Sequence, residues 1–283
     1  MEENNQPPEP SDADQLKKYA DDLVRVYQSE KEKTKELQTA NEQLVKFAGD
    51  LNRTFSELKS THQELQESHL DTIHRLVLAA EYKDEDTGDH IVRMSRYSAL
   101  IAAKLGLPDS DVQNIRYAAP MHDVGKIGIP DNILMKPGKL TDEEFDIMKT
   151  HTNIGAKILA KSKADILQLA QQIAVSHHEK WNGNGYPQGL SGSKITISGR
   201  IVGLADVFDA LTSRRPYKDP YPVEVACDII EKESGQHFDP DVANVFLENI
   251  DEFVQIKEKV GSPEDVSLTD FVRSERDQAG RGT

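Results

Sequence analysis

The segment MHDVGK, residues 121–126, places a histidine beside an aspartate at the end of an apolar stretch. Further along the chain, HHEKWNGNGYP at residues 177–187 places two histidines side by side, again after an apolar run. A divalent metal ion takes several nitrogen and oxygen ligands at roughly 2 Å, so its ligands must come from clusters that the fold brings together. The two segments therefore predict a fold built around a site for more than one metal ion, and a metal-dependent enzyme.

Other candidate ligands are histidine and aspartate residues at predicted helix ends or inside apolar segments. Asp86 and His90 are four residues apart in DEDTGDH, so a helix would place them on one face. Asp206 lies in the apolar segment RIVGLADVFDAL, where an ionised side chain is costly unless a cation or hydrogen bonds compensate it. The candidate ligands are Asp86, His90, His122, Asp123, His151, His177, His178 and Asp206, and Asp209 is more typical of a residue that orients a ligand.

Composition excludes several classes of protein. The 283 residues carry a formal net charge of -15, which argues against a protein that binds a nucleic acid polymer through a basic face. Cys227 is the single cysteine, so no intrachain disulfide can form and a cytoplasmic location is the default. The acidic N-terminus is not a signal peptide, and no apolar run approaches the roughly 18 residues of a membrane span. We therefore expect neither a membrane nor a nucleic acid polymer as a partner.

The chain divides by composition into four predicted parts. Residues 1–13 are polar and rich in proline, and we expect them to be disordered. Residues 14–75 predict a coiled-coil helix for dimerisation or signalling, and residues 76–256 an all-α catalytic domain without alternating β patterns. Residues 257–283 are polar and predict a flexible C-terminal tail. The predicted fold class is all-α, with a helical catalytic domain that follows a long N-terminal coiled-coil helix.

The coiled-coil prediction depends on leucines that recur every seven residues, at positions 37, 44, 51, 58 and 65. If these leucines occupy d positions, Asn41 occupies an a position, where a buried asparagine favours a parallel dimer. The alternative register places the leucines at a, with Tyr19, Val26, Ala40 and Phe47 at d, and the pattern does not separate the two. We expect a homodimer through this helix, with an upstream sensor or receiver protein as a source of its input.

Within the catalytic domain, helical periodicity alternates with turn signals. Ser110–Gln113 and Thr141–Glu144 have the capping-box pattern that marks helix starts. We expect helices over about 90–105, 110–123, 142–160, 163–178, 198–213, 222–233 and 239–249.

Three blocks of sequence together resemble the HD-GYP branch of the HD phosphohydrolase superfamily. They are HD followed by GK, then HHEKWNGNGYP, then RIVGLADVFDALTSRRPYK, and the resemblance covers roughly residues 76–250. It implies an all-helical HD-type domain that hydrolyses the bacterial second messenger cyclic di-GMP to pGpG, and in some members on to GMP. It also implies two or three divalent ions, iron or manganese, as cofactors.

The same resemblance implies roles for individual residues. The metal ligands would be His90, His122, Asp123, His151, His177, His178 and Asp206. Asp123 would bridge two ions, and Lys126 would lie near the scissile phosphate, so both are expected to take part in catalysis. Tyr186 of the GYP motif, with Arg215 and Lys218 of RRPYK, would hold the cyclic dinucleotide.

Asp86 is a departure from the family pattern. Members with three metal ions resemble ETGxH, with a glutamate, whereas this chain has DTGDH at residues 86–90. Aspartate is shorter by one methylene, so we expect a binuclear site in which a third ion is held more weakly, if at all.

The residue types agree with the resemblance and leave two rival functions. Mixed histidine and carboxylate ligands suit iron or manganese better than structural zinc, for which cysteine is expected. Such ions lower the pKa of a water molecule, and Lys126 could stabilise charge on the phosphoryl oxygens. A hydrolase of cyclic GMP-AMP would need the same site with other base contacts, and residues that read the base are not recognisable in the sequence. A non-catalytic scaffold that binds a cyclic dinucleotide would be expected to lose ligands, and this chain retains them.

Overall fold

The computed structural model describes residues 12–81, 83, 88–214 and 219–260. In this part of the chain the secondary structure is helical and no strand forms, apart from isolated bridges between Asn182 and Ser191 and between Ser234 and Phe238. The all-α prediction is therefore confirmed. None of the described helices is long and apolar enough to cross a membrane.

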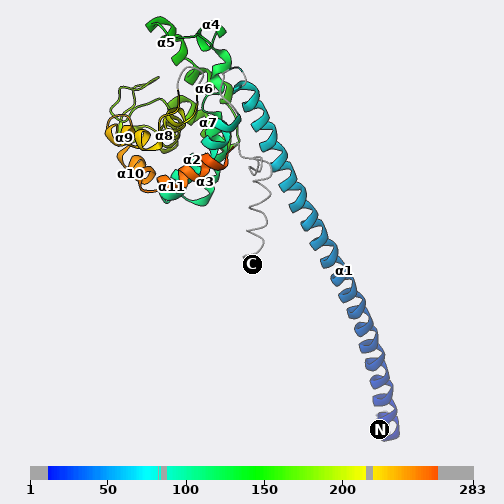
Figure 1. Ribbon diagram of the computed structural model, residues 1–283. Coiled ribbons are helices and arrows are strands. Elements are labelled where there is room, and N and C mark those ends of the chain that lie inside the picture. The colour runs from blue at the N-terminus through cyan, green and yellow to red at the C-terminus, as the bar shows by residue number, and fades with distance from the viewer. Residues whose placement is uncertain (1–11, 82, 84–87, 215–218, 261–283) are drawn as a thin grey trace, which may run out of the picture. The chain divides into compact units, whose positions relative to one another are not determined.

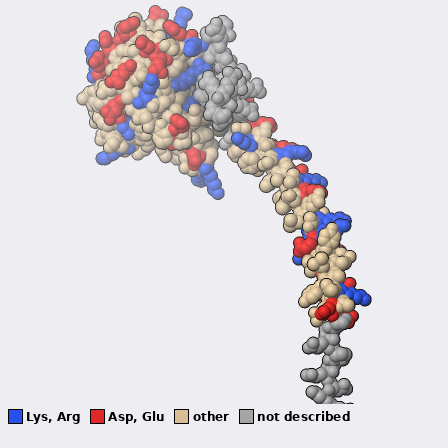
Figure 2. Space-filling view, turned by 90° about the horizontal axis from the view of Figure 1, so that it is seen from below, with Lys and Arg blue, Asp and Glu red and all other residues tan. Residues whose placement is uncertain are grey.

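By their internal contacts, residues 1–66 and residues 67–283 form two separate units. The first is made of α1 (Asp12–Glu81), a single helix of 70 residues whose C-terminal turns continue into the second unit (Figure 1). Along α1, charged side chains alternate with uncharged ones (Figure 2). The leucines of the heptad pattern remain exposed in the single chain, with Leu37 75% and Leu44 66% accessible. The coiled coil and the four-part division of the chain stay predictions.

The second unit packs short helices around α8 (Ile197–Thr212), which contacts α2, α7, α9 and α10. Its helices in chain order are α2 (Gly88–Lys104), α3 (Asp109–Ala118), α4 (Asp131–Leu134), α5 (Asp142–Lys149), α6 (His151–Leu159), α7 (Asp165–Ser176), α8, α9 (Val223–Lys232), α10 (Pro240–Glu248) and α11 (Ile250–Lys259). Three short 3-10 helices complete it, namely η1 (Ala119–Met121), η2 (Val124–Gly128) and η3 (Gly192–Lys194). Figure 1 shows α8 covered by its neighbours, as its apolar sequence predicts.

An aromatic cluster forms the centre of the core. Tyr97 of α2 lies 5.4 Å from Phe208 of α8, measured between ring centroids, and Phe208 lies 4.8 Å from Phe246 of α10. Phe253 of α11 completes the cluster at 4.6 Å from Phe246. All four rings are fully buried, so this cluster joins the N-terminal and C-terminal helices of the domain around α8.

Several predicted helix boundaries were wrong for physical reasons. The helix expected over 110–123 ends at Ala118, because Pro120 in the next turn lacks an N–H and the chain continues as 3-10 helix. The Thr141 capping box is present, but the Ser110 box is not, since Pro108 precedes α3 and no side chain caps it. The helix expected over 142–160 is two helices that meet at Thr150.

The C-terminal helix α11 was not predicted. Its sequence is mostly polar, and Phe253 is its one fully buried residue among those described. Ile250 and Ile256 also pack against the core but stay partly exposed, so the apolar pattern is weak, and the Phe253 ring anchors the helix to the aromatic cluster. Residues 261–283, most of the predicted tail, and residues 1–11 lie outside the described residues.

Candidate metal centre

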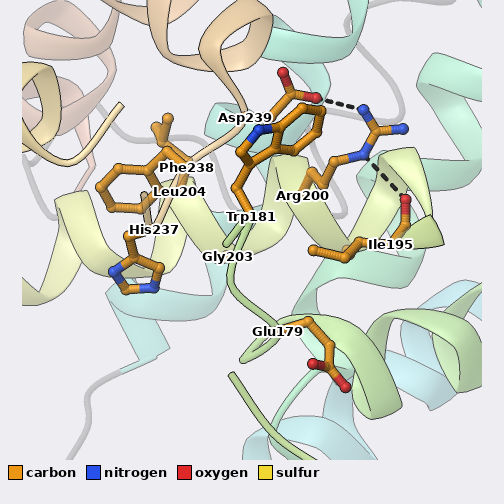
Figure 3. A pocket seen from close by; sticks show the side chains of 10 residues that line it. Glu179, Trp181, Ile195, Arg200, Gly203, Leu204, His237, Phe238 and Asp239 are labelled. Carbon is orange, nitrogen blue, oxygen red and sulfur yellow. Dashed lines mark hydrogen bonds and ion pairs between the residues drawn. The ribbon is translucent and has the colours of Figure 1, made fainter. Parts of the chain in front are cut away.

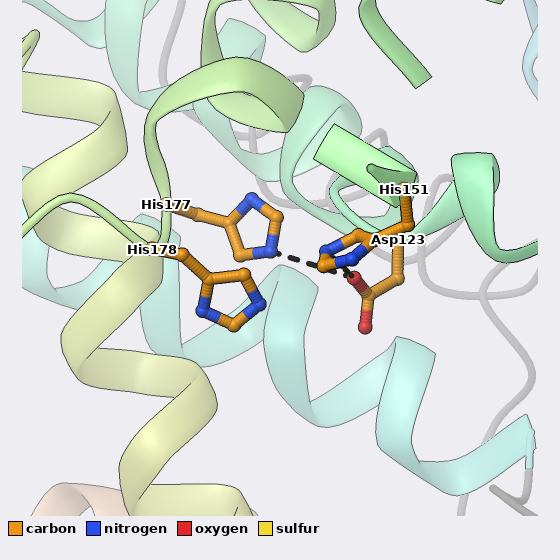
Figure 4. Close-up of side chains that lie close together, drawn as sticks. All are labelled: Asp123, His151, His177 and His178. Atoms are coloured by element: carbon orange, nitrogen blue, oxygen red, sulfur yellow. Dashed lines mark ion pairs between the residues drawn. The ribbon is translucent and has the colours of Figure 1, made fainter. Parts of the chain in front are cut away.

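The structure brings the candidate ligands into two neighbouring clusters. Asp123, His151, His177 and His178 form the first, and His90, His122 and Asp206 form the second. Within each cluster the ligand atoms lie within 4.8 Å of one another. Figure 4 shows the rings of His151 and His177 turned toward the Asp123 carboxylate. Asp86 lies outside the described residues.

The clusters form where several helix ends meet α8. His122 and Asp123 lie between η1 and η2, His151 begins α6, and the two adjacent histidines 177 and 178 follow α7 directly. His90 lies in the first turn of α2 and Asp206 in the middle of α8. A side chain at the end of a helix can point away from its own helix. Ligands from five segments can therefore converge on one point.

Two glycines allow this convergence. A Cβ at Gly125 would lie 1.9 Å from the carbonyl oxygen of His151, so only glycine lets η2 pack against the start of α6. A Cβ at Gly203 would lie 2.5 Å from the carbonyl oxygen of His177, and its absence lets α8 approach the end of α7. These two close contacts place Asp123 beside His151 and bring the aspartate-bearing part of α8 to the histidine pair.

Backbone carbonyls select the tautomer of three histidines. Nδ1 of His122 lies 3.0 Å from the oxygen of Ala119, Nδ1 of His151 2.7 Å from Met148 and Nδ1 of His177 3.2 Å from Ile173. A carbonyl oxygen can only accept, so each Nδ1 must carry the proton and donate it. In the neutral form of each ring, Nε2 then keeps its lone pair, and this is the form that binds a metal ion.

The Asp123 carboxylate faces both clusters. Its Oδ1 lies 3.2 Å from Nε2 of His151 and 3.4 Å from Nε2 of His177. Its Oδ2 lies 3.3 Å from Nε2 of His122 and 2.8 Å from Nζ of Lys126. One oxygen thus faces each group of histidines, an arrangement suited to a carboxylate that bridges two cations.

The donor atoms of the first cluster fit a bound cation. Among the residues that the structure describes, Oδ1 of Asp123 and the Nε2 atoms of His151 and His177 are buried and have no hydrogen-bond partner. Buried polar atoms without partners are costly, and groups of them that converge are rare unless an ion or water binds there. Nitrogen and carboxylate oxygen donors at this spacing suit a divalent metal ion.

The protonation states of Asp123, His177 and His178 also suit metal binding. Burial lowers the pKa of His177, and burial together with the neighbouring His177 ring holds the pKa of His178 well below its usual range. Burial opposes ionisation of Asp123, yet Lys126 and His122 hold the pKa of Asp123 well below its usual range. Neutral imidazoles around an ionised carboxylate are the forms that bind a cation without first releasing protons.

Asp209 orients His90 and pairs with an arginine that the sequence reasoning missed. Its Oδ2 accepts from Nδ1 of His90 at 2.7 Å, and its Oδ1 accepts from Nε of Arg93 at 2.5 Å. Burial would raise the pKa of Asp209, but the hydrogen bonds from His90 and Arg93 lower it to about 2. Arg93 lies three residues after His90 in the same helix, and that spacing was the available signal.

Tyr186 of the GYP loop lies over the first cluster. Its ring centroid is 4.7 Å from that of His178 and 6.4 Å from that of His151. Its backbone N–H donates to the carbonyl of His178 at 3.2 Å. On its other side, Phe145 of α5 makes an edge-to-face contact at 6.1 Å. The ring of Tyr186 thus contacts the histidines of the first cluster on one side and Phe145 on the other.

Glu179 closes the GYP loop, which the sequence did not reveal. Its two carboxylate oxygens accept from the backbone N–H groups of Gln188 at 2.7 Å and Leu190 at 2.9 Å. These bonds tie the residues after Tyr186 back to the segment that carries His177 and His178. A glutamate two residues after a histidine is also common on surfaces, so only its 6% exposure identifies it as a structural acceptor.

The far side of the same loop lies against a small pocket beside α8 (Figure 3). The backbone N–H of Trp181 donates to the carbonyl of His237 at 3.0 Å. Arg200 donates to the carbonyl of Ile195 at 3.0 Å and pairs with Asp239, and its guanidinium lies 5.7 Å from the Trp181 ring. The loop that carries Tyr186 is therefore held at its base by α8 and by the turn before α10. Arg215 and Lys218, the other predicted substrate contacts, lie outside the described residues.

The sequence of the chain is similar to those of several phosphodiesterases. The chain is 52% identical over 172 residues to a cyclic di-GMP phosphodiesterase of Thermotoga maritima, covering 61% of this chain and 47% of that protein. It is 44% identical over 191 residues to a 3'3'-cGAMP-specific phosphodiesterase of Vibrio cholerae, covering 68% and 37%. It is 43% identical over 190 residues to a cyclic di-GMP phosphodiesterase response regulator of Xanthomonas campestris, covering 67% and 50%. The chain thus spans half or less of the length of these relatives.

A solved structure shares the fold. The crystal structure of a cyclic GMP-AMP-specific phosphodiesterase of Vibrio cholerae superposes with a TM-score of 0.52 at 19% identity, covering 72% of this chain and 53% of that chain. The family model for the HD domain matches residues 77–242, which is more than half of the chain. The chain therefore belongs to the HD domain family, as its resemblance to the HD-GYP branch predicted.

Proposed function

We propose that this chain is a metal-dependent phosphodiesterase that hydrolyses a 3'-5' phosphodiester bond of cyclic di-GMP to give linear pGpG. The observation that carries the proposal is the convergence of three histidine Nε2 atoms on the two oxygens of Asp123. Hydrolysis of pGpG on to GMP would use the same groups. The names of the relatives from Thermotoga and Xanthomonas support this choice of substrate.

Two divalent ions, iron or manganese, would be held by the two clusters, with Asp123 as the shared ligand. Bound there, such ions supply positive charge at the phosphate and lower the pKa of a water molecule. Asp86 would be a ligand for a third ion, held more weakly than the other two. Three tightly held ions per chain in protein purified without oxygen would contradict that expectation.

Side chains of the chain would stabilise charge, supply a proton and bind the substrate. Lys126, with its Nζ 2.8 Å from Asp123, would stabilise charge on the phosphoryl oxygens and could protonate the departing 3'-oxygen. Tyr186 would lay its ring and hydroxyl against the nucleotide, since it lies directly over His178. Arg215 and Lys218 would bind the phosphates, the first with its planar fork of donors and the second as a point charge.

A second substrate is favoured by a specific finding. The Vibrio cholerae relative that matches 68% of this chain is named for 3'3'-cGAMP, so cyclic GMP-AMP hydrolysis by the same site is the alternative. The two cyclic dinucleotides differ in one base, so turnover of each must be measured side by side. A higher kcat/KM for cyclic GMP-AMP would overturn the proposed substrate without overturning the site.

We further propose a homodimer formed through residues 14–75 of the chain. The exposed leucines at heptad spacing on α1 support this proposal, because burying leucine side chains in a dimer interface is favourable relative to leaving them in water. An upstream sensor or receiver protein would act on the enzyme through this helix. The working location would be the cytoplasm.

The decisive experiment combines metal analysis with turnover. The full chain is purified without oxygen, its iron and manganese are counted, and cyclic di-GMP hydrolysis is followed with identification of the product. His122→Ala and Asp123→Ala should abolish turnover while circular dichroism shows unchanged helicity. Activity in either variant would overturn the site, and tight binding of cyclic di-GMP without turnover in the metal-loaded wild type would mean a non-catalytic scaffold.

A further inference from the structure

A lysine just beyond α1 contacts the backbone next to Lys126. Lys83 lies two residues after the end of the helix, and its side chain is 29% exposed. Its Nζ lies 3.0 Å from the carbonyl oxygen of Ile127, 2.7 Å from that of Ile129 and 3.1 Å from Oδ1 of Asp131. An ammonium group carries three protons, and here three acceptors surround it. A lysine that contributed only to solubility would not be expected to contact two main-chain carbonyls.

The carbonyls that Lys83 contacts belong to the turn that presents Lys126. In this turn, the N–H of Lys126 donates to the carbonyl of Asp123 at 2.9 Å, and the N–H of Ile129 donates to the carbonyl of Lys126 at 3.0 Å. Gly125 packs against the first residue of α6, and the Ile129 side chain is 1% exposed. The turn is thus held by α6, by the core and by Lys83.

We propose that Lys83 is a positioning residue for Lys126. By holding the carbonyls at 127 and 129, it fixes the turn that keeps Nζ of Lys126 2.8 Å from Oδ2 of Asp123. This inference rests on the proposed function, in which Lys126 acts on the scissile phosphate. Lys83 itself touches none of the reacting groups.

The contact of Lys83 with these carbonyls couples the end of α1 to the position of Lys126. The last turns of α1 place Val77 and Ala80 in the core of the domain, with 3% and 5% exposure. A displacement of these turns would move Lys83, and with it the turn of Lys126, while His122, His151 and His177 keep their hydrogen bonds to backbone carbonyls. Input through the helix would therefore change the rate of the chemical step more than the binding of metal or substrate.

The test compares Lys83→Met, Lys83→Arg and a matched control in the full metal-loaded chain. Lys83→Met should lower kcat about tenfold, the scale of one lost charge-assisted hydrogen bond, with KM and bound metal unchanged. Lys83→Arg should recover most of the rate, because a guanidinium can donate to the same carbonyls. Lys104→Met, which breaks the exposed Lys104–Glu252 ion pair, should match the wild type.

A double-mutant cycle separates positioning from general loss of stability. In a Lys126→Ala background, Lys83→Met should cause no further loss of kcat, since the group that it positions is absent. An equal loss in both backgrounds would overturn the proposal, and so would a Lys83→Met rate equal to that of Lys104→Met.

Hydrogen exchange gives a readout that does not require turnover. The amides of Lys126 and Ile129 should exchange faster in Lys83→Met than in wild type or Lys104→Met, with the amides of α7 unchanged. Unchanged exchange at these amides would refute the positioning role. If the wild type hydrolysed no cyclic dinucleotide, the proposed function would fail while the exchange comparison would still decide whether Lys83 holds the turn.

Discussion

The helical domain and the exposed part of α1 differ in which groups lack a suitable partner: polar atoms in the domain and apolar side chains along the helix. In the domain, polar atoms of Asp123, His151 and His177 are buried and converge without hydrogen-bond partners among the described residues. In residues 12–66 of α1, apolar side chains such as Leu44 and Leu51 are 66% and 59% exposed in water. Each arrangement is costly for an isolated chain, because buried polar atoms need partners and leucine side chains favour burial.

This contrast indicates two different missing partners. A cation satisfies converging nitrogen and carboxylate donors, whereas another apolar surface satisfies a stripe of leucines. Neither partner can replace the other. Substitutions in the two regions should therefore affect different measurements, metal content and turnover in one case and self-association in the other.

The largest effect is expected from Asp123→Asn, which would test the domain side of the contrast. The amide keeps the size of the side chain but removes the charge that faces both clusters, so we expect turnover to fall by at least about a thousandfold. In the wild type, Mn²⁺ at a hundred times its Kd should raise the free energy of unfolding by about 2.7 kcal/mol, and a chelator should remove that gain. Denaturant titration with and without Mn²⁺ should show little or no gain in the variant. An equal gain in both proteins would mean that the clusters do not hold the ion.

The α1 side of the contrast is tested by Leu44→Gln combined with Leu51→Gln. In a dimer the two substitutions remove four leucines from the interface, each worth about 1.5 kcal/mol or more, so the dimer Kd should rise at least about ten-thousandfold. Sedimentation equilibrium measures this change, while bound metal should stay the same. The control changes Lys46 and Arg53 to Gln, two residues further along the helix and off the stripe in both registers. A wild-type chain that is monomeric at every concentration would refute the coiled coil.

Glu179→Gln should have a smaller effect, confined to the GYP loop. Glutamine can accept from only one of the two N–H groups of Gln188 and Leu190, and its NH₂ group would face the other donor. We expect KM to rise about tenfold with bound metal unchanged, because Tyr186 would bind substrate less well. Steady-state kinetics in a Tyr186→Ala background provides the control, where the substitution should add nothing. A full effect in that background would assign Glu179 another role.

Much of the fold was predictable because its signals are local. The heptad leucines predicted a long helix, and the apolar segment around Ala205 and Phe208 predicted the buried α8. The break at Thr150 was not predictable, because the sequence reads as helical on both sides of it. The break lies beside a tertiary contact, because Gly125 packs directly against the carbonyl of His151, the first residue of α6.

The candidate site shows the same division between local and tertiary information. Histidines and aspartates in unusual pairs, such as His122 with Asp123, could be singled out by residue type alone. The two oxygens of Asp123 that face different clusters could not, since that depends on how η2, α6 and α7 meet. Glu179 and Lys83 were missed or left undecided because their partners are mostly backbone groups, which a sequence does not mark.

The smallest predicted effect concerns His237, a partly buried histidine that belongs to neither cluster. Burial, and to a smaller extent the positive charge of Lys180, lowers the pKa of His237 from 6.5 to about 4. Protonation therefore favours the unfolded chain, so stability is complete above pH 6.5 and falls as the pH drops toward 4. The full shift corresponds to about 3 kcal/mol, which we reduce to about 1 kcal/mol because the ring is partly exposed to solvent.

Between pH 7 and pH 5, the metal-free wild type should lose about 1 kcal/mol more of its free energy of unfolding than His237→Gln. Urea titrations at the two pH values measure the difference, and His62→Gln on the exposed part of α1 should follow the wild type. Equal losses in wild type and His237→Gln would mean that this ring is hydrated in the fold, and that acid sensitivity arises at the metal centre instead.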